Sequence, residues 1–155
     1  MAIPDFVLAL RAKIGNDPLW LSGVTAVVLR DNDVLLVRRA DNGAWTPVTG
    51  IIDPGEQPAV AAAREVLEEA DIVAVPEAVA RILVTPPVVY GNGDITQYLD
   101  IAFVCRWVSG EPYPADGENT EAAWFPLDAL PELSDDMASR IRSAVEFTGV
   151  TSFDL

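Results

Sequence analysis

The sequence predicts an α/β fold (α+β mixed) built on one mixed sheet. Helical and strand patterns both occur, but they do not follow the strict β-α-β alternation that produces a parallel sheet. The chain has 155 residues, half of them hydrophobic, which is enough to bury a proper core. We therefore expect a single domain over residues 1–155, without internal repeats or a linker.

The first segment has the spacing of an amphipathic helix over residues 3–14. Its apolar residues recur three or four positions apart, and they are Ile3, Phe6, Val7, Leu10 and Ile14. We interpret residues 1–20 as an N-terminal helical extension, packed on the domain or on a partner subunit.

Strands are expected next, because short apolar runs are separated by turn residues. Val24–Leu29 and Val34–Val37 flank the polar residues 31–33, which predicts a hairpin. Ala44–Thr49 is predicted to be a short strand that leads into a loop ahead of the next helix.

A helix over residues 57–70 is followed by two strands. Ala78–Thr85 is a strand that the prolines at 86 and 87 stop, and residues 91–94 form a turn. Thr96–Val108 is the longest expected strand, and its apolar centre indicates burial on both faces.

The last part of the chain begins with a loop over residues 112–120, which is rich in Pro, Gly, Asp and Glu. Ala122–Pro126 is the last expected strand. A C-terminal helix follows over residues 135–147, with Ser134 as its N-cap.

The helix over 57–70 carries the most informative side chains. At about 100° per residue, Glu65, Glu68 and Glu69 fall within one narrow sector. Like charges this close are unfavourable unless a cation or a proton neutralises them, and hard cations such as Mg²⁺ prefer oxygen ligands. A separate apolar face is expected to pack on the core, and it contains Ala59, Ala63, Val66 and Ala70.

A solvated acidic face is the alternative, because glutamate is a good helix former and exposed acidic helices are common. The flanking residues favour a built site. Gly50 and the Pro54-Gly55 pair make a loop before the helix, and Arg64 lies one turn before Glu68, where it pairs with a carboxylate.

The spacing of these residues matches a known motif. The matching residues are Gly50, Glu56, Arg64, Glu65, Val66, Glu68, Glu69 and Ile72. With them, the segment 50–72 resembles the Nudix box of the Nudix (MutT-like) hydrolase family, and the likeness extends into the strands before it and into residues 124–128. Asp71 stands where the family has glycine, and aspartate tolerates the left-handed conformation that ends such a helix.

The resemblance implies a fold, an activity and a cofactor. The fold is a curved mixed β-sheet core sandwiched between helices. The activity is Mg²⁺-dependent pyrophosphohydrolysis of a nucleoside diphosphate linked to another group, either a nucleoside triphosphate or an ADP-ribose-like compound. The metal, with Mn²⁺ as a substitute, would be held by the carbonyl of Gly50 and by Glu65, Glu68 and Glu69.

Other box residues have supporting roles in the family. Glu56 is expected to stabilise the loop, and Arg64 to orient a glutamate through a charge-assisted hydrogen bond. The general base stays open. Glu68 is the first candidate, and Glu118 and Glu121 in the acidic loop before Trp124 are the others, although loop acids are usually solvated.

The substrate-binding residues are less defined. Alternation sends Arg38 and Arg39 to opposite faces of a strand, so that one reaches a phosphate and the other pairs with a surface acid, and we take Arg38 as the substrate-binding one. Trp45, Tyr90 and Tyr98 are aromatic residues that either stack on a base or pack in the core.

Two residues beyond the box give conflicting indications of the substrate. Pro87 lies where relatives that cleave ADP-ribose carry proline, and Tyr90 lies near a tyrosine of relatives that act on dinucleoside polyphosphates. The sequence therefore leaves the choice of nucleotide open.

Charge and composition exclude other classes of protein. The net charge of −14 argues against binding a nucleic-acid polymer, but it is compatible with a nucleotide bridged by a metal. Because the chain has no histidine, a Ser-His-Asp triad and histidine zinc sites are excluded. The single lysine, Lys13, lies outside any Walker loop.

The single cysteine, Cys105, lies in an apolar run and is expected to be a buried structural thiol. With no disulfide available within the chain, no signal peptide and no apolar run of about 20 residues, we expect a cytoplasmic protein without a membrane partner. A homodimer formed through the N-terminal helix is a further expectation.

Two functions are compatible with these features. The first is the Mg²⁺-dependent hydrolase described above. The second is a non-catalytic Nudix module that senses a nucleotide or binds a protein. Such modules are expected to lose box carboxylates, and this chain keeps them, so the enzyme is favoured.

Overall fold

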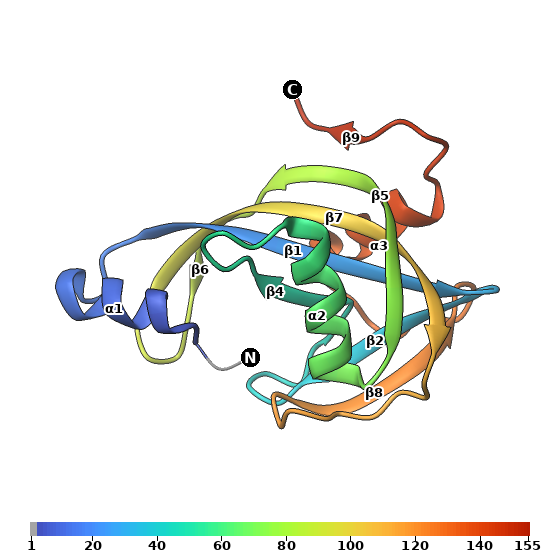
Figure 1. The fold of residues 1–155 in the computed structure, drawn as a ribbon, viewed down its shortest axis with the longest axis horizontal. Coiled ribbons are helices and arrows are strands. Elements are labelled where there is room, and N and C mark those ends of the chain that lie inside the picture. The colour runs from blue at the N-terminus through green and yellow to red at the C-terminus, as the bar shows by residue number, and fades with distance from the viewer. Residues whose placement is uncertain (1–2) are drawn as a thin grey trace.

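The computed structural model describes residues 3–155, which form three helices and nine strands (Figure 1). The helices are α1 (Asp5–Ile14), α2 (Pro58–Ala70) and α3 (Asp135–Val145). The strands are β1 (Leu19–Arg30), β2 (Asp33–Arg39), β3 (Trp45–Thr46), β4 (Val48–Ile51), β5 (Val73–Val84), β6 (Val88–Val89), β7 (Ile95–Ser109), β8 (Asn119–Pro126) and β9 (Ser152–Phe153). Of the extension expected over 1–20, Met1 and Ala2 lie outside the described residues, Asp5–Ile14 is helical, and β1 already begins at Leu19.

The strands form one mixed sheet, as the sequence predicts. Its main order is β3-β2-β1-β7-β5-β9, with β4 paired to β1, β6 to β7 and β8 to β2. β1 runs parallel to β7 and antiparallel to β2 and β4, so both kinds of pairing meet at one central strand.

The sheet opens where β2 leaves β1. The two strands pair only where Leu29 faces Val34 and Arg30 faces Asp33, whereas residues 23–26 of β1 pair with β4. The far end of β2, which carries Arg38 and Arg39, lies instead between β3 and β8. This divergence leaves room for a cleft that Glu69, in the last turn of α2, borders.

Helices cover both faces of the sheet. Alternate residues of β1 point to opposite sides, so Val24 and Val28 pack under α2 while Val27 packs under α3. Figure 1 shows α2 in front of the sheet and α3 behind it. The expected arrangement of a curved sheet between helices is therefore confirmed. Among residues 3–155, no helix is long and apolar enough to cross a bilayer.

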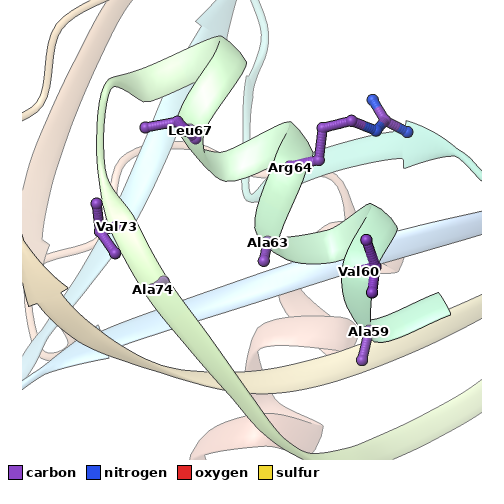
Figure 2. A pocket seen from close by; sticks show the side chains of 7 residues that line it. All are labelled: Ala59, Val60, Ala63, Arg64, Leu67, Val73 and Ala74. Atoms are coloured by element: carbon purple, nitrogen blue, oxygen red, sulfur yellow. The ribbon is translucent and has the colours of Figure 1, made fainter. Parts of the chain in front are cut away.

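The buried face of α2 differs from the expected one. Its buried residues are Ala61, Ala62, Glu65, Val66, Glu69 and Ala70. The prediction that Ala59 and Ala63 pack on the core is wrong, because the helix is turned so that two of its carboxylates face inward. Ala59 and Ala63 instead border a hollow of about 460 Å³ between α2 and β5, from which Arg64 points away (Figure 2).

Several boundaries also shift for local reasons. Pro47 divides the strand expected over 44–49 into β3 and β4. β5 begins at Val73 rather than at Ala78, because the sheet accommodates Pro76 at an irregularity in its pairing with β7.

Two capping predictions are confirmed. The hydroxyl of Ser134 accepts a hydrogen bond from the backbone N–H of Met137 at 3.3 Å. Asp71 ends α2 in the left-handed conformation, with φ 55° and ψ 33°. The expected core position of Cys105 is also confirmed, and burial raises the pKa of its thiol to about 12.

Candidate metal and substrate site

Arg64 connects the loop before α2 to the acidic side of that helix. Its guanidinium donates to Glu56 at 2.8 Å, to Glu65 at 2.9 Å and to Glu68 at 3.1 Å. The expected pairing with Glu68 one turn later is thus confirmed, and Glu56 closes the loop by also accepting from the N–H of Asp53. Hydrogen bonding to Arg64 holds the pKa of Glu56 below its ordinary value.

Glu65 and Glu69 are buried side chains on the inner face of α2. Glu65 occupies the space beside Gly50 of β4, and Glu69 accepts a hydrogen bond from the amide of Asn119 at 3.0 Å. Burial raises the pKa of each carboxyl to about 7, against the opposing effects of Arg64 on Glu65 and of Asn119 on Glu69. Two buried carboxylates one turn apart are a natural binding place for a cation.

The acidic loop after β7 is attached to the last turn of α2 by its backbone. The N–H of Tyr113 donates to the carbonyl of Ala70 at 3.0 Å, and the N–H of Ala115 donates to that of Glu69 at 3.4 Å. These bonds satisfy helix carbonyls that have no partner within the helix. The loop is thereby held against the carboxylate end of α2.

This attachment brings acids from distant parts of the chain together. One carboxylate oxygen from each of Glu69, Asp116 and Glu118 lies within 4.8 Å of the other two. All three donors are oxygens, which is the ligand type that a hard divalent cation such as Mg²⁺ prefers. The donor set therefore fits the cation that the sequence implied.

The predicted trio of box glutamates is arranged differently. Among the described residues, the acids that converge this closely are Glu69, Asp116 and Glu118, whereas Glu65 and Glu68 are joined through Arg64. Asp116 and Asn119 were not foreseen as site residues. The only sequence signal for them was the acidic composition of the loop over 112–120.

A cleft of about 1250 Å³ extends from this acidic cluster. It is bordered by Gly50, Glu69 and Glu118, and it reaches α1, the end of β2 and the start of α3. Of the three candidates for the general base, Glu118 borders the cleft. Glu121 belongs to β8, where it pairs with Arg38 at 2.8 Å, and Glu68 is half exposed beside Arg64.

The two arginines at the end of β2 have different surroundings. Arg38 donates to Glu121 and to the carbonyl of Gly43, and its side chain is 45 % exposed. Arg39 donates to both carboxylate oxygens of Asp41, at 2.9 and 2.6 Å. The pKa of Arg39 is raised mainly by Asp41 and further by the nearby Tyr90 and Glu69.

Arg39 is thus electrostatically coupled to the acidic site. The pairing of β2 with β8 is irregular between the two arginines, and both residues border the cleft. Each of them pairs with an acid in this structure, and which of the two reaches a substrate phosphate stays a prediction.

The aromatic candidates have mixed roles. Trp45 packs edge-to-face on Phe125, with ring centroids 4.9 Å apart, and it joins the core under α3 while bordering the cleft. The hydroxyls of Tyr90 and Tyr98 lie 2.7 Å apart, and both residues border the cleft. Neither Trp45 nor Tyr98 is purely a core residue.

The fold and the acidic cleft agree with the family that the box resembles. A family model described as NUDIX domain matches residues 20–146. The chain belongs to the Nudix family and is a hydrolase that acts on a phosphoric anhydride bond.

Two curated proteins with similar sequences agree with this family. A MutT-like protein of Streptomyces ambofaciens is 33% identical over 137 residues, covering 86% of this chain and 82% of the relative. The NAD-capped RNA hydrolase NudC of Pseudomonas aeruginosa is 34% identical over 119 residues, and the match covers 75% of this chain but only 40% of that protein.

The fold is also shared with solved structures. The crystal structure of an ADP-ribose pyrophosphatase from Streptococcus suis superposes with a TM-score of 0.68 at 22% identity, covering 86% of this chain and 98% of that one. At this identity, the likeness concerns the fold alone.

Proposed function

We propose that this protein is a Mg²⁺-dependent pyrophosphohydrolase that releases a nucleoside monophosphate. Its substrate is a nucleoside diphosphate linked to another group, either an ADP-ribose-like compound or a nucleoside triphosphate. The observation that supports this proposal is the convergence of Glu69, Asp116 and Glu118 at the edge of a cleft large enough for a nucleotide.

The box residues would hold the metal, with Mn²⁺ as a substitute. The proposed ligands are the carbonyl of Gly50 and the carboxylates of Glu65, Glu68 and Glu69, and Asp116 would offer a further oxygen beside Glu69. When bound, the cation would withdraw charge from the phosphoryl oxygens and make a bound water more acidic. Arg64 keeps Glu65 and Glu68 in place by sharing one guanidinium nitrogen between them.

We assign the general base to Glu118. Its carboxylate lies within 4.8 Å of that of Glu69 and borders the cleft, where an attacking water has access. Glu68 and Glu121 are the weaker candidates, because neither of them borders the cleft. A carboxylate in this place takes the proton of the water as it attacks phosphorus.

Substrate phosphates need a cation beside the metal. Arg39 is the better placed of the two arginines, because it borders the cleft and is near enough to Glu69 and Tyr90, which also border it, for them to raise its pKa. Arg38 lies farther out with Glu121, and Trp45 and Tyr90 offer ring surfaces to the nucleotide. The role assigned to Arg38 from the sequence is therefore reassigned to Arg39 in this proposal.

The names of the relatives do not agree on one substrate, so the proposed class stays broad. The complete set of box carboxylates favours hydrolysis over the non-catalytic alternative, since a buried acidic cluster is costly to keep without its metal. A location in the cytoplasm and a homodimer belong to the same proposal.

The test is the release of nucleoside monophosphate from a panel of nucleotides. The panel contains ADP-ribose, a dinucleoside polyphosphate and nucleoside triphosphates, each assayed with Mg²⁺ and with a chelator. We expect release from at least one compound with Mg²⁺, none with the chelator, and release slowed by about two to three orders of magnitude in the Glu69→Gln variant. If the wild-type protein with Mg²⁺ releases no monophosphate from any of them, the proposed function is wrong.

A further inference from the structure

Helix α1 lies outside the part of the chain that the family model matches, yet it forms a wall of the cleft. The match begins at residue 20, whereas α1 spans Asp5–Ile14. Val7 of α1 is 5 % exposed and packs with Leu21 and Ile51, and it borders the cleft. This wall is therefore an addition to the matched domain.

Helices α1 and α3 stand on the same face of β1. Leu21 packs against α1, and Thr25 accepts a hydrogen bond from Arg140 of α3 at 2.9 Å. Residues two apart on a strand share a face, so Leu21, Gly23 and Thr25 point the same way, and Leu21 and Thr25 are about 13 Å apart. Gly23, which also borders the cleft, forms the floor between the two helices, where other groups closely surround it.

This floor adjoins the proposed metal site. A Cβ atom at Gly23 would lie 3.4 Å from the carbonyl oxygen of Gly50, 3.4 Å from the ring of Tyr98 and 3.3 Å from the carboxylate of Asp100. From Gly50 the cleft therefore runs one way to Tyr98 and α1. It runs the other way to Asp100 and the start of α3.

The α1 end has a definite chemical character. Val7 and Val88 supply apolar walls, and Tyr90 and Tyr98 present a pair of hydroxyls joined at 2.7 Å. Apolar walls suit the face of a ring, and the hydroxyl pair suits a ligand that carries hydroxyl groups. A sugar or nucleoside has both features.

We propose that α1 and the hairpin arm (residues 86–96) form a subsite for a sugar or nucleoside carried at the second end of the diphosphate. This inference rests on the proposed function and narrows it, because the preferred substrate then has an organic group on both sides of the diphosphate. The cleft has a volume of about 1250 Å³, which exceeds the roughly 300–1,000 Å³ of a usual small-molecule pocket. It therefore has room for an organic group on each side of the diphosphate.

Arg11 holds the two walls of this subsite together. It donates to the carbonyl of Ile95 at 2.7 Å and to the hydroxyl of Thr96 at 3.2 Å, and it lies 3.5 Å from the carboxylate of Asp94. The same guanidinium donates to the carbonyl of Asp17 at 2.6 Å, which fixes the end of α1. Arg11 is thus a positioning residue for the subsite.

The test compares a two-ended ligand, ADP-ribose, with a one-ended ligand, ADP. Equilibrium binding is measured by calorimetry with Ca²⁺, and the KM and kcat for ADP-ribose and ATP are measured with Mg²⁺. Tyr90→Phe removes one hydroxyl and Arg11→Ala releases α1, while Leu8→Ala on the exposed side of the same helix is the matched control.

We expect the wild-type protein to bind ADP-ribose more tightly than ADP. Tyr90→Phe and Arg11→Ala should each weaken ADP-ribose binding three- to tenfold, about the effect of one hydrogen bond, and raise its KM with kcat within twofold. The Leu8→Ala variant should match the wild type.

Two outcomes would overturn the subsite. One is an equal loss for ADP-ribose and ADP in both variants, which would indicate a general structural effect. The other is wild-type affinity for ADP-ribose no greater than for ADP. Absence of turnover would count against the proposed function, while the calorimetric comparison would still decide the subsite.

Discussion

Gly50 and Glu65 are packed so closely that a Cβ atom added at Gly50 would lie 2.2 Å from the carboxyl carbon of Glu65. Residue 50 therefore has to be glycine, because the buried Glu65 carboxylate fills the space that a side chain at this position would need. The same contact sets the Glu65 carboxylate beside the strand whose carbonyl is a proposed ligand.

Gly50→Ala is expected to displace Glu65 while leaving the fold in place. The neighbouring atoms belong to a side chain, which moves at lower cost than a backbone. We expect kcat/KM with Mg²⁺ to fall at least tenfold, as for the loss of an orienting contact around a metal. Circular dichroism checks the fold, and an unchanged kcat/KM would show that the position of Glu65 is unimportant.

Glu69→Gln is expected to lower kcat by two to three orders of magnitude, about the effect of losing one group that stabilises transition-state charge. The substitution keeps the size of the side chain and removes its charge. Glu77→Gln, which changes an exposed glutamate paired with Arg106, is the matched control. Equal activity in the two variants would contradict the assignment of Glu69.

The stability of the metal-free protein should decrease as the pH rises from about 4.5 to about 7. Burial raises the pKa of Glu65 and of Glu69 to about 7, above the value of roughly 4.3 in an unfolded chain. Within this window the folded protein binds protons that the unfolded chain has released, so the free energy of unfolding falls as the pH rises.

Urea unfolding of the wild type and of Glu69→Gln, in chelator at pH 5 and pH 8, measures this effect. We expect Glu69→Gln to gain stability relative to the wild type at pH 8, by about 1 to 3 kcal/mol, and to lose that advantage at pH 5. Saturating Mg²⁺ at pH 8 should raise the Tm of the wild type more than that of the variant. A pH-independent difference between the two proteins would refute the explanation.

Arg64→Ala should lower both the free energy of unfolding and the activity more than Arg64→Lys does. Removing the guanidinium leaves the buried Glu65 without its cation, which we expect to cost roughly 2 to 4 kcal/mol of unfolding free energy along with most of the activity. Lysine keeps the charge but not the fork that reaches Glu56, Glu65 and Glu68 together, so its effect should be intermediate. Chemical denaturation and kcat measurements would reveal whether the two variants differ in this order.

Arg39→Ala should raise KM more than Arg38→Ala does. Arg39 is coupled to Glu69 and Tyr90, whereas Arg38 forms an exposed pair with Glu121, and exposed pairs contribute little. We expect at least a tenfold increase in KM for Arg39→Ala and less than a threefold increase for Arg38→Ala. The reverse order in steady-state kinetics would restore the role that the sequence suggested for Arg38.

Local features of the site could be predicted from the sequence because they depend on short spacings. The helix of the box, the pairing of Arg64 with Glu68 and the left-handed Asp71 are all of this kind. The rotation of α2 was not predictable, because apolar and acidic residues compete for the same buried face and only tertiary packing decides between them.

Long-range contacts in the site could not be predicted from the sequence. Asn119 meets Glu69 across 50 residues, and the acidic loop reaches α2 through backbone bonds that no residue pattern reveals. The choice between Arg38 and Arg39 depends on an irregularity in the pairing of β2 with β8, where simple alternation fails.

The loop after β7 is joined to α2 through main-chain groups of Tyr113 and Ala115 rather than through their side chains. The attachment of the loop to the helix therefore tolerates any amino acid at those two positions except proline, which has no N–H to donate. Other substitutions there should change the surface of the loop while the acids at 116 and 118 stay close to Glu69.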